Sequence, residues 1–316
     1  MREPLVTIGV CFKNAELTIE KTVESIINQS YPHKRMEIIF VDDGSEDGTL
    51  PIILDYVSKM DIKTKVFYGK WRGLGASRRV IVENAGGGYI VWVDAGLLLA
   101  KDHVKKQVRF MEENPRVGIA KGRYGISSAQ NLIANLENVG DFVHFWRDAE
   151  GFVHSGKETS KLPGTGGSIY RVEAINQVGN FDKNIMGACE DTDIAWRIKL
   201  AGWSICVTGA TFHKWRKETL FDLWNHHFWY GYGLHYIFHK HGRKNIFPSH
   251  KMVPPAGFVE GLLYSMTAYK LTRRKMVFLL PLQYTFKRTA TCLGFTKSHI
   301  DSYGHDNARA YTQIQQ

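Results

Sequence analysis

Strand-like and helix-like segments alternate over the first 115 residues, and this alternation limits the possible folds more than any other feature. Short apolar, β-branched runs predict buried strands at residues 5–12, 36–43, 63–69 and 88–95. Segments with apolar residues at helical spacing predict helices at residues 16–30, 50–60, 75–86 and 101–114. Strands that alternate with helices predict an α/β fold with a mostly parallel central sheet that helices cover on both faces.

Polar and acidic residues follow each predicted strand. The strand ends carry CFKN, VDDGS, KWRG and VDAG, which begin at Cys11, Val41, Lys70 and Val93. Sheets of this type bind ligands beyond the carboxyl ends of their strands. The sequence therefore predicts a ligand site along this edge.

The chain changes character twice after residue 116. Residues 117–189 are less regular and contain the glycine-rich stretch GTGGSIYR, which leads into a strand or helix. Beyond residue 215 aromatic, histidine and basic residues become frequent. We predict one domain over 1–245, made of two parts (1–116 and 117–245). A helical, amphipathic extension and tail follow over 246–316.

Charge and cysteine content narrow the partners and the compartment. The formal net charge of +10 favours anionic partners such as phosphorylated small molecules, anionic lipid or nucleic acid, and no nucleic-acid recognition motif is present. The four cysteines are far apart in sequence, and we expect the two that lie in apolar strand-like runs to be buried thiols, which fits a reducing compartment. No cleavable signal pattern and no apolar run of about 20 residues is found, so we expect a cytoplasmic protein.

Four motifs together resemble glycosyltransferase family 2 over residues 5 to about 240. They are VTIGVCFKNAE with its following helix, MEIIFVDDGSEDGT, GYIVWVDAG, and GTGGSIYR through CEDTDIAWRIKLAGW, and they occur in the order typical of that family. The resemblance implies the GT-A fold, in which a Rossmann-like nucleotide-binding half joins an acceptor half. It also implies transfer of a sugar from a nucleotide diphosphate donor with inversion at the anomeric carbon. A UDP-sugar is favoured by its frequency in the family.

The resemblance assigns a nucleotide-sugar site to the strand ends. The residues implied are Cys11, Lys13, Asp42, Asp43, Arg72, Arg78 and Asp94. Asp43 would contact the nucleobase with Asp42 in a lesser role, and the arginines would neutralise the diphosphate. The alternative is an Asp-Gly turn with a helix cap. For Arg79 we favour a solvated helix face.

The metal site is where the sequence departs from the family pattern. The family carries two acids in a D-x-D motif, but here Asp94 is followed two residues later by Gly96. We expect a divalent cation, Mn²⁺ or Mg²⁺, on Asp94 and His213, since carboxylate and imidazole both suit Mn²⁺. Two other outcomes are open: cations such as Arg72 or Lys13 replace the metal, or the site binds donors without turning them over.

The CEDTD stretch supplies the predicted catalytic base. An inverting transfer needs one carboxylate to take the proton from the acceptor hydroxyl, and the resemblance assigns this to Asp191 with Glu190 beside it. The acceptor is expected against Gly166, Gly167 and Trp196. The alternative is that Asp191 only caps the helix that follows.

The late histidines and basic helices have plainer explanations. We expect packing or an interface, not a metal, for five histidines of one aromatic-rich segment: His226, His227, His235, His239 and His241. Residues 250–296 mix apolar and basic residues, which suits either an anionic membrane surface or a helical pair packed on the catalytic domain.

Taken together, these features predict an inverting glycosyltransferase on the inner face of the cell membrane. It would transfer a sugar to a hydroxyl of a saccharide or lipid-linked acceptor, with Asp191 as general base. Two alternatives remain: a polyprenyl-phosphate glycosyltransferase, and a non-catalytic nucleotide-sugar-binding subunit, which Gly96 supports and the CEDTD acids oppose.

Overall fold

The computed structural model describes residues 3–125, 131–149, 162–185, 187–215, 219–242 and 252–303. The chain forms two compact units. Unit 1 comprises Met1–Ser127, Phe145–Asn184 and Asp191–Arg216, and unit 2 comprises Ser128–His144, Ile185–Glu190 and Lys217–Gln316. Our domain boundaries at residues 116 and 245 stay a prediction.

Unit 1 is built on one mixed sheet. Its strands within the described residues are β1 (Val6–Phe12), β2 (Met36–Asp42), β3 (Lys63–Tyr68), β4 (Tyr89–Trp92), β5 (Leu97–Leu99), β6 (Val117–Tyr124), β7 (Ser168–Arg171) and β8 (Ser204–Lys214). They are arranged in the order β3-β2-β1-β4-β7-β6-β8-β5. The half from β3 to β4 is parallel, whereas β7 pairs antiparallel with β4 and β6, and β5 pairs antiparallel with β8.

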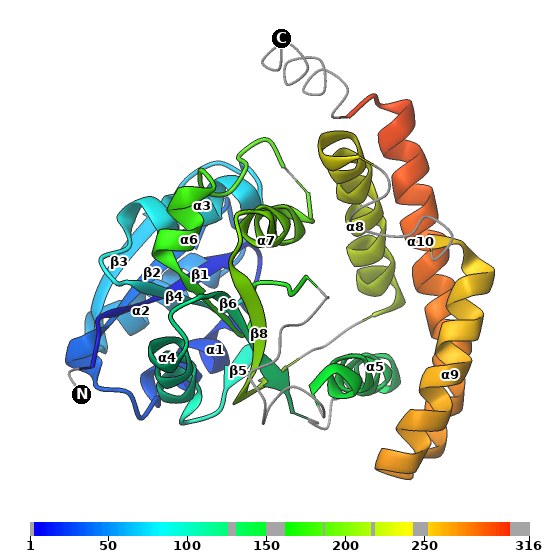
Figure 1. Ribbon diagram of the computed structural model, residues 1–316, viewed down its shortest axis with the longest axis horizontal. Helices are drawn as coiled ribbons and strands as arrows, with labels where there is room; N and C mark the ends of the chain where they lie inside the picture. The colour runs from blue at the N-terminus through cyan, green and yellow to red at the C-terminus, as the bar shows by residue number, and fades with distance from the viewer. Residues whose placement is uncertain are drawn as a thin grey trace. The chain divides into compact units, whose positions relative to one another are not determined.

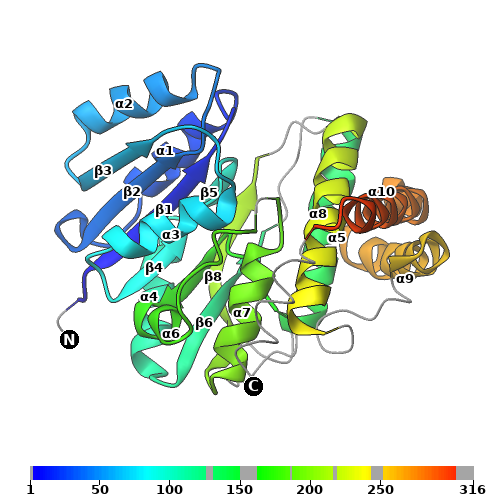
Figure 2. The same cartoon turned by 90° about the horizontal axis from the view of Figure 1, so that it is seen from above.

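Helices cover both faces of this sheet, as predicted (Figures 1 and 2). The helices of unit 1 are α1 (Ile19–Ile27), α2 (Thr49–Lys59), α3 (Leu74–Asn84), α4 (His103–Glu113), α6 (Val172–Gln177) and α7 (Glu190–Leu200). One core contains side chains of α1, α2 and α4, and the other contains side chains of α3, α6 and α7. All residues of β1 and β2 are buried, as expected for parallel strands covered on both sides. The predicted α/β fold class is confirmed.

Strand register brings the ends of the first three strands to one edge. Phe12 of β1 pairs with Asp42 of β2, and Asp42 pairs with Tyr68 of β3. The residues that follow these strands therefore emerge together. Strand register also brings two later segments together. The antiparallel strands β4 and β7 pair Trp92 with Ser168, so the residues beyond β4 run alongside those before β7.

Unit 2 is helical. It contains α5 (Leu132–Ala149) as far as His144, then α8 (Leu220–His241), α9 (Pro254–Thr272), a 3₁₀ turn η3 (Lys275–Leu279) and α10 (Leu280–Ile300). The helices α8 and α10 run parallel. Trp224 packs on Phe286 near the starts of both helices, and the Tyr232 hydroxyl donates a hydrogen bond to Asp301 at the end of α10. The helix α9 runs antiparallel to α10 and packs beside it (Figure 1). No helix within the described ranges combines the length and the apolar character needed to cross a bilayer.

Glycine allows α8 and α10 to approach closely. A Cβ added to Gly294 of α10 would overlap the carbonyl of Phe228 in α8, and one added to Gly231 of α8 would overlap the carbonyl of Thr291. Both obstacles are backbone atoms, which cannot move aside as a side chain can. The two helices therefore pack at a distance that any larger residue would forbid.

We predict that Gly294→Ala destabilises the protein. In an unobstructed helix the same change stabilises by about 1 kcal/mol. Here the overlap with Phe228 forces the helices apart, and such overpacking costs roughly 1–3 kcal/mol. Chemical denaturation of both proteins measures the sign. Thr296→Ala, at an exposed position of the same helix, is the control and should change stability by less than about 0.5 kcal/mol. A more stable Gly294→Ala protein would contradict the close approach.

Candidate functional site

A pocket opens at the carboxyl ends of β2 and β3, beside the start of α3. Its lining consists of Val41, Asp42, Asp43, Phe67, Tyr68, Gly69, Lys70, Arg72, Ala76, Ser77 and Val80. The pocket combines acidic, basic and aromatic side chains, so it can offer both hydrogen bonds and a flat apolar surface to a ligand. Three of the predicted nucleotide-binding residues are among those that line it.

The two aspartates after β2 do different things. The carboxylate of Asp43 accepts the backbone N–H groups of Arg72 at 2.8 Å and Gly73 at 3.0 Å, and so holds the loop before α3. Its oxygens retain further lone pairs for a ligand donor. Asp42 instead accepts from the backbone N–H and the hydroxyl of Ser45, at 2.9 and 2.7 Å, which makes it a turn-forming residue.

The cations and the thiol predicted at this edge are placed as follows. Lys13 is exposed and its Nζ lies 5.4 Å from the ring centroid of Trp71, which places it beside the loop after β3. The side chain of Arg72 is exposed at the pocket. Cys11 is buried and its thiol packs in the core with Trp92, so only the backbone there can meet a ligand. Arg79 pairs with Glu83 on the surface of α3, as the solvated alternative predicts.

Asp94 lies against a buried arginine. The guanidinium of Arg78 is 3.2 Å from Asp94 Oδ1 and packs over the rings of Trp92 and Phe181. The Arg78 side chain is 4 % exposed, while that of Asp94 is 49 % exposed. Arg78 therefore fixes one oxygen of Asp94 from inside the protein and leaves the carboxylate open to the site.

Position 96 has no room for a second acid. Gly96 has φ +87°, and its N–H donates to Thr22 Oγ1 while its carbonyl accepts from the N–H of Trp215. A Cβ at this position would lie 2.9 Å from the carbonyl oxygen of Trp215. The glycine is required by the backbone conformation, so the missing carboxylate is a property of the local fold.

His213 is the other predicted metal ligand. His213 of β8 lies opposite Leu98 of β5, and its Nδ1 is buried with no hydrogen-bond partner among the described residues. Its ring lies against the backbone of Gly125, where a Cβ would overlap it. Imidazole and carboxylate are both donor types that suit Mn²⁺, and the joint role of His213 and Asp94 as metal ligands stays a prediction.

A glycine loop lies between the two candidate functional acids. The β4–β7 register sets Asp94 opposite Gly166, and a Cβ on Gly166 would overlap Asp94 Oδ2. At the other end, a Cβ on Gly164 would lie 3.0 Å from Asp191 Oδ2. Two residues span at most about 7 Å. The carboxylates of Asp94 and Asp191 thus lie against glycines that are only two residues apart in the chain.

Buried Lys121 holds this loop. Its Nζ donates to the carbonyls of Gly164, at 3.1 Å, and Gly166, and it lies 5.1 Å from the ring centroid of Phe212. Gly167 is engaged on both sides: its N–H donates to Trp92 and its carbonyl accepts from Gly122. Direct acceptor contacts through the Gly167 backbone would have to displace these bonds.

The three acids at the start of α7 differ in how deeply they are buried. Asp193 is fully buried and pairs with Arg197, whose guanidinium also bonds the carbonyls of Val178 and Asn180. Glu190 is 2 % exposed. Asp191 is half-buried, and its Oδ1 accepts the backbone N–H of Thr192 at 2.7 Å. Of the three, Asp191 is the acid placed to meet a ligand.

Two residues of this region were absent from our sequence predictions. Tyr68 ends β3, is largely exposed and lines the pocket, which its place at a strand end could have suggested. Lys121 is a basic residue at a buried position of β6, where burial would signal a special partner. Trp196 is half-buried on α7, and its predicted acceptor contact stays a prediction.

Comparison with known proteins decides the family. The model of the family described as glycosyl transferase family 2 matches residues 7–179, which is more than half of the chain. The chain belongs to glycosyl transferase family 2. The predicted family and the predicted enzyme class, a glycosyltransferase, are therefore confirmed.

Several curated glycosyltransferases are similar to this chain over part of their length. An uncharacterized glycosyltransferase of Haemophilus influenzae is 35% identical over 39% of this chain and 48% of its own. The putative teichuronic acid biosynthesis glycosyltransferase TuaG of Bacillus subtilis is 38% identical over 35% of this chain and 43% of its own. The poly-beta-1,6-N-acetyl-D-glucosamine synthase of Staphylococcus epidermidis is 24% identical over 62% of this chain and 45% of its own. The chain thus spans less than half the length of these relatives.

Solved structures support the GT-A fold. The mannosyltransferase PcManGT from Pyrobaculum calidifontis, in complex with GDP-Man and Mn²⁺, has a TM-score of 0.65 at 18% identity, over 95% of this chain and 88% of its own. S. aureus TarS 1-349 in complex with UDP has a TM-score of 0.51 at 17% identity, over 91% of this chain and 90% of its own. At these identities the likeness is one of fold.

We predict that Gly96→Asp lowers stability without creating a stronger metal site. A residue with a Cβ at φ +87° costs about 1–2 kcal/mol, and contact with the Trp215 carbonyl adds to this. Gly96→Ala carries the steric part alone and is the matched control. Thermal unfolding measures the first effect, and Mn²⁺ titration in the presence of UDP measures the second. Tighter Mn²⁺ binding at unchanged stability would show that the backbone at position 96 accepts an acid.

Proposed function

We propose that the protein is an inverting glycosyltransferase that transfers a sugar from a nucleotide diphosphate donor to an acceptor hydroxyl, with Asp191 as general base. The observation that carries the proposal is the Gly164–Gly166 loop, which borders Asp94 at one end and Asp191 at the other. One acid then lies on the donor side and the other on the acceptor side of the same short loop.

The nucleotide occupies the pocket at the ends of β2 and β3. Asp43 accepts a hydrogen bond from the base, and Tyr68 supplies a flat surface beside it. The exposed cations Lys13 and Arg72 neutralise the diphosphate. We favour a UDP-sugar as the donor.

The transfer needs one proton acceptor and one good leaving group. The acceptor oxygen attacks the anomeric carbon from the face opposite the diphosphate, and its proton passes to a carboxylate oxygen of Asp191. The bond from the anomeric carbon to the diphosphate breaks, and the nucleoside diphosphate leaves with that electron pair. Attack from the opposite face inverts the anomeric configuration.

Asp94 and His213 are the residues that would hold Mn²⁺ or Mg²⁺. A divalent cation bound there stabilises the negative charge that builds on the leaving diphosphate. Arg78 keeps the Asp94 carboxylate in place through its ion pair, so Asp94 is oriented before a donor binds.

We further propose that the acceptor is attached to a lipid and that α9 lies on an anionic membrane surface. One face of α9 exposes large apolar side chains: Phe258, Val259, Leu262, Leu263 and Met266. Exposed Lys270, Arg273 and Lys275 follow at its end. An apolar helix face beside basic residues is the pattern of helices that lie in the bilayer interface. A saccharide carried on a lipid, or a polyprenyl phosphate itself, would be presented at that surface.

Asp191→Asn tests the catalytic role. Without a proton acceptor we expect transfer to fall by about 100-fold or more, while UDP binding stays unchanged because Asp191 lies on the acceptor side. Calorimetry with UDP, with and without Mn²⁺, measures binding, and release of UDP or GDP from UDP-N-acetylglucosamine or GDP-mannose measures turnover.

Asp55→Asn changes an exposed surface acid on α2 that pairs with Lys59; this variant is the control and should keep full turnover.

UDP binding that strengthens with Mn²⁺ supports the role of Asp94 and His213. Equal UDP binding without Mn²⁺ assigns the neutralisation of the diphosphate to Lys13 and Arg72. Unchanged turnover in Asp191→Asn overturns the assigned base. Measurable UDP binding without turnover in the wild-type protein favours the non-catalytic alternative.

Leu262→Glu tests the membrane surface. Losing one buried leucine and adding a negative charge should weaken binding to vesicles that contain phosphatidylglycerol by about tenfold. Sedimentation with these vesicles, and with vesicles of phosphatidylcholine alone, measures the change. Leu54→Glu, at a similarly exposed leucine of α2, is the control. No vesicle binding by the wild-type protein, or an equal loss in both variants, would exclude α9 as the contact.

A further inference from the structure

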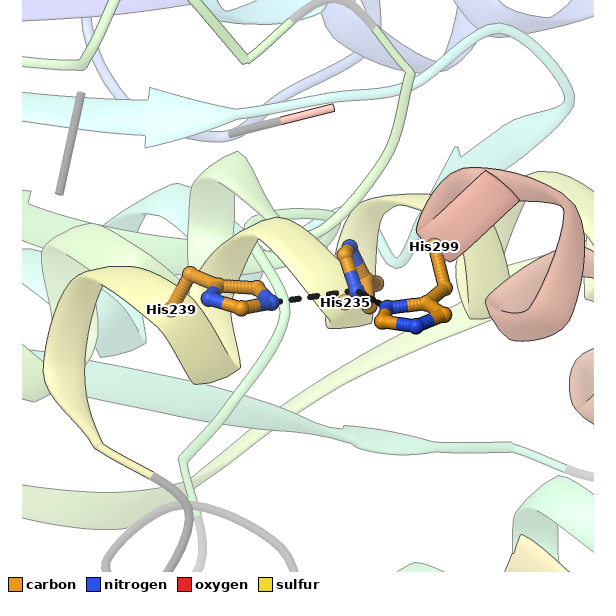
Figure 3. Close-up of side chains that lie close together, drawn as sticks. All are labelled: His235, His239 and His299. Carbon is orange, nitrogen blue, oxygen red and sulfur yellow. Dashed lines mark hydrogen bonds between the residues drawn. The ribbon is translucent and has the colours of Figure 1, made fainter. Parts of the chain in front are cut away.

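Three histidines of unit 2 point their ring nitrogens at one another (Figure 3). His239 Nε2 lies 3.1 Å from His235 Nε2, and His299 Nδ1 lies 3.2 Å from the same atom. One nitrogen from each ring falls within 4.8 Å of the other two. This cluster belongs to unit 2 and is separate from the residues proposed for the donor site, which belong to unit 1.

The helices explain how the cluster forms. His235 and His239 are four residues apart on α8 and so share one face of that helix. The parallel course of α10 brings His299, in its last turn, to the same face. From the sequence we expected packing for the α8 histidines. His299 was not among the candidates, because 60 residues separate it from His239.

Two imidazoles approach the same nitrogen of His235. His235 Nδ1 lies 3.1 Å from Ser298 Oγ, so this ring can donate there and leave its Nε2 as an acceptor. That nitrogen has a single lone pair, yet both His239 and His299 approach it at bonding distance. In the other tautomer it has a single proton for two neighbours. Either way, one of the two close contacts lacks a good hydrogen bond.

We propose that His235, His239 and His299 bind a divalent transition-metal ion of the Zn²⁺ type. Three imidazoles suit Zn²⁺, and a tetrahedral ion with Zn–N bonds of about 2.0–2.1 Å separates its ligand atoms by roughly 3.3 Å. The observed separations of 3.1 and 3.2 Å are close to this value. An ion held by one nitrogen of each ring would remove the competition for His235 Nε2.

The surroundings favour a cation at this place. Ser298 Oγ can accept from His235 Nδ1, and in that tautomer Nε2 presents its lone pair to the metal. His239 and His299 both stand in the last turn of their helices, where the helix dipole favours positive charge. His235 is 1 % exposed, whereas His299 is exposed, so the site has a buried side and a side through which the ion can enter. The bound ion would join the end of α8 to the end of α10.

Metal binding is tested on the full-length, tag-free protein after treatment with a chelator. Equilibrium dialysis against Zn²⁺ with elemental analysis should find one ion per chain at this site, and Co²⁺ should give the visible absorption of a tetrahedral complex. His299→Gln and His239→Gln should each weaken Zn²⁺ binding by at least about 100-fold and abolish the Co²⁺ spectrum. Ser298→Ala should weaken it by about 10–100-fold.

His241→Gln is the matched control, because it changes a histidine of the same helix end outside the cluster and should bind Zn²⁺ as tightly as the wild-type protein. Asp94→Asn should also retain the ion, which separates this site from the one proposed for the donor. His299 is exposed, so His299→Gln tests the ligand set without disturbing the core. Full Zn²⁺ binding by His299→Gln, or none by the folded wild-type protein, would overturn the proposal.

Discussion

The contact of Lys121 with the Gly164–Gly166 loop is the interaction on which the candidate reaction centre depends. A buried ammonium is costly unless acceptors surround it, and the two loop carbonyls and the face of Phe212 supply that compensation. In return the lysine fixes the course of a loop that has few side chains of its own to anchor it. Because Asp94 and Asp191 both lie against this loop, its position sets how far apart the two acids stand.

The sheet brings donor and acceptor elements together through two different kinds of pairing. Parallel strands β1, β2 and β3 end in register and place Lys13, Asp43 and the following loop at one edge. The antiparallel pair of β4 and β7 then turns the chain back, so that residues after one strand face residues before the other. A purely parallel sheet would keep the glycine loop at the opposite edge from Asp94. The reversal at β7 is therefore what places the glycine loop, which borders the proposed acceptor side, next to Asp94.

Strands and helices, which depend on residues close together in the chain, could be predicted from the sequence. Contacts between residues far apart in the chain could not. Hydrophobic periodicity predicted the strands and helices of the first half and the α/β class, although the three-residue strand β5 was too short to detect. The sequence placed Asp43, Asp94 and Asp191 at element ends, where the structure has them. It could not reveal that Arg78 turns inward to Asp94, that Lys121 bonds a loop 43 residues away, or that His299 meets α8. Each of these depends on the packing of elements that local patterns do not relate.

Gly96 has a consequence for how this site can change over generations. A single nucleotide change turns any glycine codon into a codon for an acid, aspartate for two of the four codons and glutamate for the other two. The backbone at φ +87° and the neighbouring carbonyl of Trp215 oppose that step until the turn itself is rebuilt. An acid at position 96 therefore requires a rebuilt turn as well as a changed codon. The shape of the turn, and not only the chemistry of the site, restricts this position to glycine.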